Sequence, residues 1–186
     1  MVVASHDTMI EVTVASPQRE CVMHSSHESV PSTLSWRIRA EPGYAMVELF
    51  GPLNETADFA SLRQRLKGPV VLHMGGVQRI NSGGVREWIQ FMRDLSVENV
   101  TLTHCTPVVV AQLNMIYSFC GKARVLSFFA PYACSSCDRE EEKLIYVQTH
   151  FPNHDFTRMP QFHCACGGTM EFDDMVERYL GFLRQS

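Results

Sequence analysis

The sequence predicts an α/β fold, in which a mixed β-sheet packed with helices is followed by a small cysteine-rich module and a C-terminal helix. Two features of the chain lead to this prediction. Between residues 34 and 130, short apolar strands alternate with amphipathic helical segments, which is the pattern of a sheet covered by helices. From residue 131 onwards apolar residues become sparse, and four cysteines fall in two close pairs. We therefore expect one domain over residues 34–130 and a cysteine-rich module with a terminal helix over residues 131–186.

Residues 1–33 differ from the rest of the chain because they are rich in serine and poor in apolar side chains. Only residues 10–14 alternate like a strand, and that stretch is too short to build a core. Such a composition favours disorder, so we expect a disordered N-terminal segment. Met23 could be the true start of the chain, in which case much of this segment would not belong to the protein.

The 34–130 domain is predicted to contain, in order, strand, strand, helix, strand, helix, strand, helix and strand. Its strands are short apolar or alternating runs bounded by turn residues, and a Glu-Pro-Gly turn joins the first two into a hairpin. The expected strands lie at residues 34–39, 44–50, 69–74, 100–103 and 125–129.

Apolar side chains spaced along one face predict the helices. The clearest helix carries such a stripe from Val85 to Leu95, with charged residues on its other side. Thr56 is expected to cap an earlier helix, and Pro107 to open a later one whose stripe runs to Cys120. In the cysteine-rich module, residues 144–147 predict a strand and residues 172–183 a C-terminal helix.

Composition argues against two classes of partner. The chain of 186 residues has a formal net charge of −4, and nucleic-acid-binding proteins usually present a basic face. No run approaches the ~18 apolar residues of a membrane helix, and the N-terminus lacks the basic start of a signal peptide. We therefore expect a soluble, cytoplasmic chain with neither a nucleic-acid partner nor a membrane partner.

Two stretches resemble a known family. Residues 46–57, Met-Val-Glu-Leu-Phe-Gly-Pro-Leu-Asn-Glu-Thr-Ala, resemble the strand, Gly-x-Leu-Asp turn and helix start of STAS domains, which occur in anti-sigma-factor antagonists and sulfate-transporter tails. Residues 80–85, Ile-Asn-Ser-Gly-Gly-Val, are similar to the Asp-Ser-Ser/Thr-Gly-Leu loop of that family. The resemblance implies a STAS-like fold over residues 34–130. It also implies a regulatory protein-binding module without catalysis, whose partner is an anti-sigma-type kinase or a signalling complex.

The resemblance further implies that Ser82 is a phosphoacceptor. Around it the partner would contact Asn81, Gly83, Gly84 and Asn54. A phosphate at a helix N-terminus meets unpaired N–H groups, and it adds a charge of about −1.5 to −2. Asn81 and Asn54 stand where the family usually has Asp, so a scaffold without a phosphorylation switch is an alternative. Ser82 could also be an ordinary helix cap, and Gly83 and Gly84 could serve close helix–sheet packing.

The cysteine pairs predict a structural zinc site. Cys134 and Cys137 form a C-x-x-C pair, and Cys164 and Cys166 stand just before two glycines. Two such pairs separated by a hairpin are typical of a zinc ribbon, whose four ligands close the metal's tetrahedron. The fourth ligand is either Cys164 or His163, and we favour Cys164 because four-cysteine sites are common. Zinc would also supply folding energy to a segment with few apolar residues.

A thiol-disulfide oxidoreductase that uses Cys134 and Cys137 is the second hypothesis. A strand followed by C-x-x-C is typical of thioredoxin-like sites. Such a site needs a long helix and further strands after it, and here the remaining chain is short and contains the second cysteine pair. The neighbouring acidic run at residues 138–142 would also raise a thiol pKa, which is unfavourable for a reactive thiolate.

Overall fold

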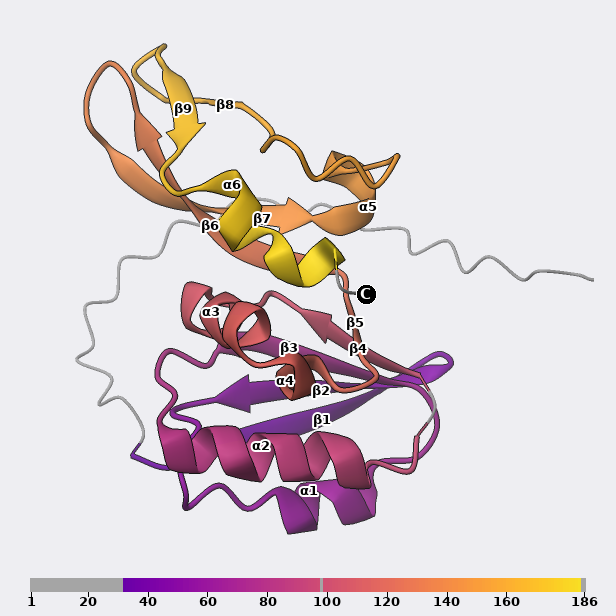
Figure 1. Cartoon of the computed structure of the whole chain (residues 1–186). Helices are drawn as coiled ribbons and strands as arrows, with labels where there is room; N and C mark the ends of the chain where they lie inside the picture. Colours follow the sequence, from indigo (N-terminus) through magenta and orange to yellow (C-terminus); the bar gives the residue numbers. More distant parts are fainter. Residues whose placement is uncertain (1–31, 98, 185–186) are drawn as a thin grey trace, which may run out of the picture.

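The computed structural model of the chain describes residues 32–97 and 99–184. It is mixed α/β with two β-sheets, so the predicted fold class is confirmed at this level (Figure 1). The expected disorder of residues 1–33, the short strand at residues 10–14 and the alternative start at Met23 lie outside the described residues, apart from Ser32 and Thr33.

The first sheet has five strands in the order β1-β2-β3-β4-β5. β1 and β2 form the predicted antiparallel hairpin, and the remaining neighbours are parallel. Parallel neighbours require crossover connections, which the helices supply. The strands are β1 (Ser35–Glu41), β2 (Tyr44–Phe50), β3 (Val70–Gly76), β4 (Val100–Thr103) and β5 (Arg124–Val125).

Helices cover one face of this sheet, as α1 and α2 show in Figure 1. Side chains that alternate onto that face, such as Leu49 and Leu72, are fully buried. Trp88 of α2 lies among them, and its indole N–H donates to the Phe119 carbonyl at 2.8 Å, so its one polar group is satisfied. The helices of this part are α1 (Phe59–Arg65), α2 (Ser82–Asp94), α3 (Pro107–Met115) and α4 (Tyr117–Cys120).

The second sheet is antiparallel, with the order β7-β6-β9-β8, and lies beside α3 (Figure 1). The strand expected at residues 125–129 is divided between the sheets. Its first residue, Val125, belongs to β5. After Leu126 the chain continues as β6 in the second sheet, and this strand runs past residue 130, where we expected the first domain to end. The elements are β6 (Ser127–Cys134), β7 (Glu140–Tyr146), α5 (Val147–His150), β8 (Phe162–His163), β9 (Thr169–Phe172), α6 (Val176–Tyr179) and a 3₁₀ helix, η1 (Gly181–Arg184).

The long C-terminal helix that the apolar stripe predicts is not formed. Phe172 belongs to β9 and faces Tyr132 of β6, and the Asp173 N–H donates to the Pro131 carbonyl at 3.0 Å. Only α6 and η1 are helical in this region. Strand pairing with β6 satisfies the backbone of the first stripe residues, so tertiary contact overrides their helical spacing.

Two smaller expectations about helix ends are also wrong. Asp58, and not Thr56, caps α1, because the Asp58 carboxylate accepts the Ser61 N–H at 3.1 Å. The Thr56 N–H and hydroxyl instead donate to the Asn54 side-chain oxygen. The stripe expected to run to Cys120 is interrupted at Ile116, whose backbone is extended and separates α3 from α4.

Gly84 marks the closest approach between α2 and the loop after β2. A Cβ at this position would lie 2.0 Å from the Leu53 carbonyl oxygen and 2.6 Å from the Asn54 backbone nitrogen. Only a residue without a side chain allows this packing, so Gly84 has the close-packing role that was one of its two interpretations.

We expect Gly84→Ala to lower the free energy of unfolding by about 3 kcal/mol, because the added methyl meets backbone atoms that cannot rotate away. Gly83→Ala is the comparison variant. Its Cβ would lie nearest to side-chain atoms and not to backbone, at 2.8 Å from Glu55 Cβ and 3.3 Å from the Asn81 side-chain oxygen, so its loss should be smaller. Urea denaturation of the two variants checks the difference. Equal losses would contradict the assigned contact.

Candidate metal centre and partner-binding face

Two tight turns of the second sheet bring the four predicted cysteines together. Cys134 ends β6 and Cys137 lies in the turn to β7, while Cys164 and Cys166 lie in the turn between β8 and β9. The turns are neighbours because β6 pairs with β9, and the Ser135 N–H donates to the Thr169 carbonyl at 3.1 Å. The four sulfur atoms all lie within 4.8 Å of one another.

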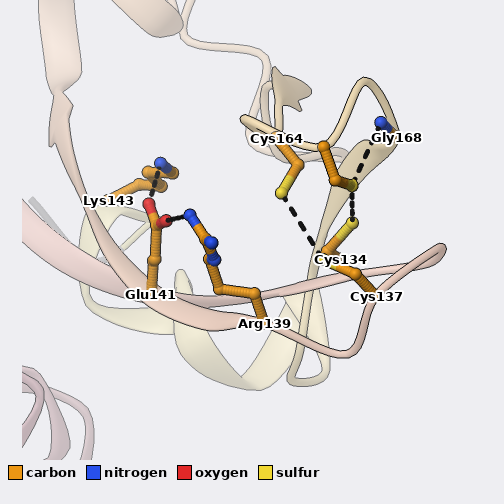
Figure 2. Close-up of polar contacts among 8 residues, drawn as sticks. Cys134, Cys137, Arg139, Glu141, Lys143, Cys164 and Gly168 are labelled. Atoms are coloured by element: carbon orange, nitrogen blue, oxygen red, sulfur yellow. Dashed lines mark hydrogen bonds and ion pairs between the residues drawn. The ribbon is translucent and has the colours of Figure 1, made fainter.

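The sulfur geometry suits a tetrahedral metal ion. The Cys134 and Cys166 sulfurs are 3.5 Å apart, and those of Cys137 and Cys164 are 3.7 Å apart (Figure 2). A tetrahedral Zn²⁺ with ordinary zinc–sulfur bonds needs sulfur–sulfur distances of about 3.8 Å. Within residues 32–97 and 99–184, the group that could hold a metal consists of these four cysteines, and His163 is not part of it.

Each turn is closed by a backbone hydrogen bond to the carbonyl of its first cysteine. The Asp138 N–H donates to the Cys134 carbonyl, and the Gly167 N–H donates to the Cys164 carbonyl. Both residues are left-handed, with φ of 54° at Asp138 and 90° at Gly167. Glycine adopts this conformation freely, and Asp is among the few other residues that tolerate it. The sequence pattern indicated the role of Gly167, whereas Asp138 was interpreted only as part of an acidic run.

Backbone N–H groups also point at two of the sulfurs. The Ser136 N–H lies 3.4 Å from the Cys134 sulfur. The Gly168 N–H lies 3.4 Å from the Cys166 sulfur (Figure 2). The Ser136 N–H lowers the pKa of the Cys134 thiol to about 7. At Cys137 the Arg139 N–H acts in the same direction, but the neighbouring thiols outweigh it and raise the pKa to about 12.

Four thiols this close cannot all ionise unless a positive charge lies among them. A divalent cation supplies that charge and accepts all four sulfurs as thiolates. The acidic residues of β7 disfavour ionisation of the thiols less than their number suggests, because Arg139 and Lys143 both pair with Glu141 (Figure 2). The Lys143 hydrogen bond lowers the pKa of the Glu141 carboxyl.

The arrangement is less suited to a thioredoxin-like dithiol. The Cys134–Cys137 turn leads into strand β7, whereas such a dithiol stands at the start of a long helix. In addition, the hydrogen-bonded sulfur pairs join one turn to the other, Cys134 to Cys166 and Cys137 to Cys164.

The predicted partner-binding residues gather at the start of α2. Asn81 caps the helix, because its side-chain oxygen accepts the Gly84 N–H at 2.8 Å. The interpretation of Ser82 as the cap is therefore wrong. Ser82 is the first residue of the helix, is exposed, and its hydroxyl makes no hydrogen bond to the described residues.

Asn54 lies in the neighbouring loop. A hydrogen bond joins the two loops, in which the Asn81 N–H donates to the Leu53 carbonyl at 3.0 Å. Asn54 and Asn81 both line an open groove of about 750 Å³ between these loops and α3. Arg79 and Gln112 add polar groups to its wall, and Ile80 and Val108 add apolar ones. The structure thus brings the two loops that the sequence singled out to one concave surface.

Glu55, which contacts the groove residue Asn81, is a residue that sequence reasoning missed. Its carboxylate accepts the Asn81 side-chain N–H at 2.8 Å and lies over Gly83. The Asn81 hydrogen bond is the main cause that lowers the pKa of the Glu55 carboxyl. Glu55 therefore places a negative charge at the start of α2, where the helix dipole favours it. No spacing rule in the sequence relates residue 55 to residue 81, so only the folded chain shows this contact.

Two comparisons with known proteins bear on the chain as a whole. No family model and no curated protein matches the chain. Among the residues that the structure describes, no helix has the length and apolar character to cross a membrane. Function is therefore argued from the two sites themselves.

Gly168 is the point where the turn between β8 and β9 packs against the turn that carries Cys134 and Ser136. A Cβ there would lie 2.5 Å from the Ser136 hydroxyl oxygen and 3.0 Å from the Cys134 sulfur. We expect Gly168→Ala to push the turns apart and to weaken metal affinity by about 10- to 100-fold. Competition for Zn²⁺ with a chromophoric chelator measures the change.

The second variant Gly168→Ala/Ser136→Gly removes the nearest obstacle, so it should recover most of the affinity. Ser136→Gly alone serves as the control and should bind Zn²⁺ as the unchanged chain does. Unaltered affinity in Gly168→Ala would contradict the contact between the turns.

Proposed function

We propose that the protein is a non-enzymatic regulatory module that binds another protein at the start of α2 and is stabilised by a structural zinc ion. The single observation that carries the proposal is the groove where the Asn54 and Asn81 loops meet, with Ser82 exposed beside it. In class it would resemble the anti-sigma-factor antagonists, and its partner would be an anti-sigma-type kinase or another signalling complex.

The donor set supports zinc as the metal. Four thiolates in a tetrahedral arrangement suit zinc or iron among the common metals. Four protein ligands would leave no position for a catalytic water, which supports a structural role. The strands that the ion would join are short, since β8 has two residues and β9 has four. The ion would thus stabilise a part of the sheet whose strands are too short to do so alone.

The chain purified without chelator is expected to contain one zinc ion per molecule, and Cys164→Ser is expected to lose it. Where free zinc exceeds its dissociation constant a hundredfold, binding contributes about 3 kcal/mol to folding, so that variant should be less stable by a similar amount. Cys120→Ser, at a half-buried cysteine outside the group of four, is the control. Elemental analysis and urea denaturation give the two readouts. A metal-free chain with four freely titrating thiols would overturn this assignment.

Charge at the start of α2 supports a switch at Ser82. The Glu55 carboxylate already lies there through its hydrogen bond to Asn81. A phosphate on Ser82 would add a charge of about −1.5 to −2 to the same helix end. A partner that docks in the groove would therefore meet two neighbouring negative groups instead of one. We propose that this like-charge change releases the partner.

A pull-down with purified baits tests the switch. The partner should be held by the unchanged chain and by Ser82→Ala, and it should be recovered at least about tenfold less with Ser82→Asp, a loss that corresponds to 1.4 kcal/mol. Ser118→Asp, at an exposed serine of α4, controls for added charge elsewhere. Equal recovery with all four baits would mean that Ser82 is not a switch and would favour the scaffold hypothesis.

The low pKa of the Cys134 thiol is the one observation that favours the oxidoreductase hypothesis. That function would require Cys134 and Cys137 to cycle between dithiol and disulfide with a dithiol reductant. Tightly bound zinc and inert thiols in the assay above would exclude it.

A further inference from the structure

Two histidines from different strands of the first sheet stack on each other. His73 lies in β3, and His104 follows the end of β4. Their ring centroids are 4.2 Å apart and the rings are inclined by 22°. Both side chains are half-buried, and His104 has a left-handed backbone with φ of 53°. Neither histidine belongs to the groove or to the cysteine group.

The His73 ring has its Nδ1 in an accepting role. The Gly75 N–H donates to it at 3.3 Å. The ring lies directly on this backbone, since a Cβ at Gly75 would be 2.8 Å from His73 Cε1. A ring nitrogen that accepts a hydrogen bond carries no proton, so this contact requires the neutral imidazole.

The hydrogen bonds around His104 are all satisfied when its Nδ1 also accepts. The His104 N–H donates to the Ser127 hydroxyl oxygen at 2.9 Å, and the Ser127 and Thr103 hydroxyl oxygens are 2.7 Å apart. Thr103 lies 3.0 Å from His104 Nδ1. Both hydroxyl groups are buried and both are satisfied if Ser127 donates to Thr103 and Thr103 donates to His104 Nδ1. That order again leaves Nδ1 without a proton.

The turn that contains His104 joins the two sheets. The residue after it, Cys105, donates its N–H to the Ser127 carbonyl and accepts the Phe129 N–H, both in β6. The His104 ring also makes edge contacts with Phe129 of β6 and Tyr146 of β7, at centroid distances of 6.0 and 6.4 Å. The protonation state of the His104 ring therefore affects the contacts that hold the second sheet against the first.

The charged and titratable groups around the pair come from several elements. Glu48 of β2 lies beside His73 in register, and Arg37 and Arg39 of β1 pair with Glu48. On the other side, His150 of α5 stacks on Tyr146. Burial lowers the pKa of both His73 and His104; the Glu48 charge partly opposes this at His73, and His73 lowers the pKa of His104 further.

We propose that the His73–His104 stack is a proton-sensitive latch between the two sheets. A proton taken from solvent by either Nδ1 replaces an acceptor by a donor, which then faces the Gly75 N–H or the Thr103 hydroxyl. Two adjacent cationic rings also repel each other. The stack then opens, and the hydrogen bonds between Cys105 and β6 weaken. The latch is independent of the zinc ion and of the groove, so it goes beyond the function proposed above.

The direction of the pH effect follows from the neutral state of the folded pair. The folded chain binds fewer protons at these sites than the unfolded chain, whose histidines titrate near a pKa of about 6.5. The stabilisation is therefore complete above that pH and is lost as the pH falls through it toward the lowered values of the folded state.

The test compares the full chain with His73→Asn/His104→Asn between pH 7.5 and pH 5. Asn keeps an acceptor near the position of Nδ1, cannot be protonated, and tolerates the left-handed backbone at residue 104. His154→Asn is the matched control, because His154 is exposed and also left-handed, with φ of 53°. The first readout is the slope of unfolding free energy against pH. The second is hydrogen exchange at the amides of Cys105, Leu126 and Phe129.

Near pH 6, the unchanged chain and His154→Asn should take up protons when they unfold. The number taken up per molecule should exceed that of the double variant by up to about two. The junction amides should lose protection at low pH in these two chains only, while those of Val47 and Leu72 in the centre of the first sheet should not. Imidazole nitrogen spectra at pH 7.5 should show both Nδ1 atoms unprotonated. Equal pH slopes in the double variant and the unchanged chain, or a protonated Nδ1 at pH 7.5, would overturn the proposal.

Discussion

The backbone of Cys105 joins the two halves of the molecule. Its N–H donates to the Ser127 carbonyl at 3.1 Å, and its carbonyl accepts the Phe129 N–H at 2.8 Å. These bonds align β6 with the carboxyl end of β4. Phe128 of β6 is fully buried, with its ring against Tyr179 and Phe182. The second sheet therefore extends the core of the first, and separating the two would expose apolar surface to water. The cysteine group closes the far end of the same strand, so β6 connects the sheet junction to the candidate metal centre.

The three functional features differ in how they are stabilised. The groove beside α2 depends on backbone contact, since Gly84 packs directly against Leu53. The cysteine group depends on sulfurs that need a cation to lie so close as thiolates. The histidine stack, as we propose it, depends on neutral rings whose Nδ1 atoms accept from the Gly75 N–H and the Thr103 hydroxyl. Because these requirements are different, the proposed effects of metal, phosphate and protons are separable.

Local sequence patterns correctly predicted the helices and strands whose apolar side chains lie on the face that is buried in the folded chain. The helix expected from Val85 onwards is α2, and the run before Gly75 is β3. Prediction failed for two different reasons. Phe172 has helical spacing, but a contact distant in sequence decides its backbone, because it pairs with Tyr132 of β6. At the start of α1 the error is local, because Thr56 bonds to Asn54 while Asp58 takes the capping position.

Residue types and short spacings in the sequence predict the α/β class and a metal site at Cys134, Cys137 and Cys166, with Cys164 or His163 as the fourth ligand. The family resemblance adds the loops at Asn54 and Asn81 as a candidate surface. Short-range patterns carry this much because thiolates bind metals and Asn and Ser favour helix starts wherever they occur. The folded chain was needed to show that Cys164 and not His163 lies in the group of four, that Glu55 lies against Asn81, and that His73 stacks on His104. These contacts join residues brought together by strand pairing and crossovers, and no local spacing encodes such a neighbour.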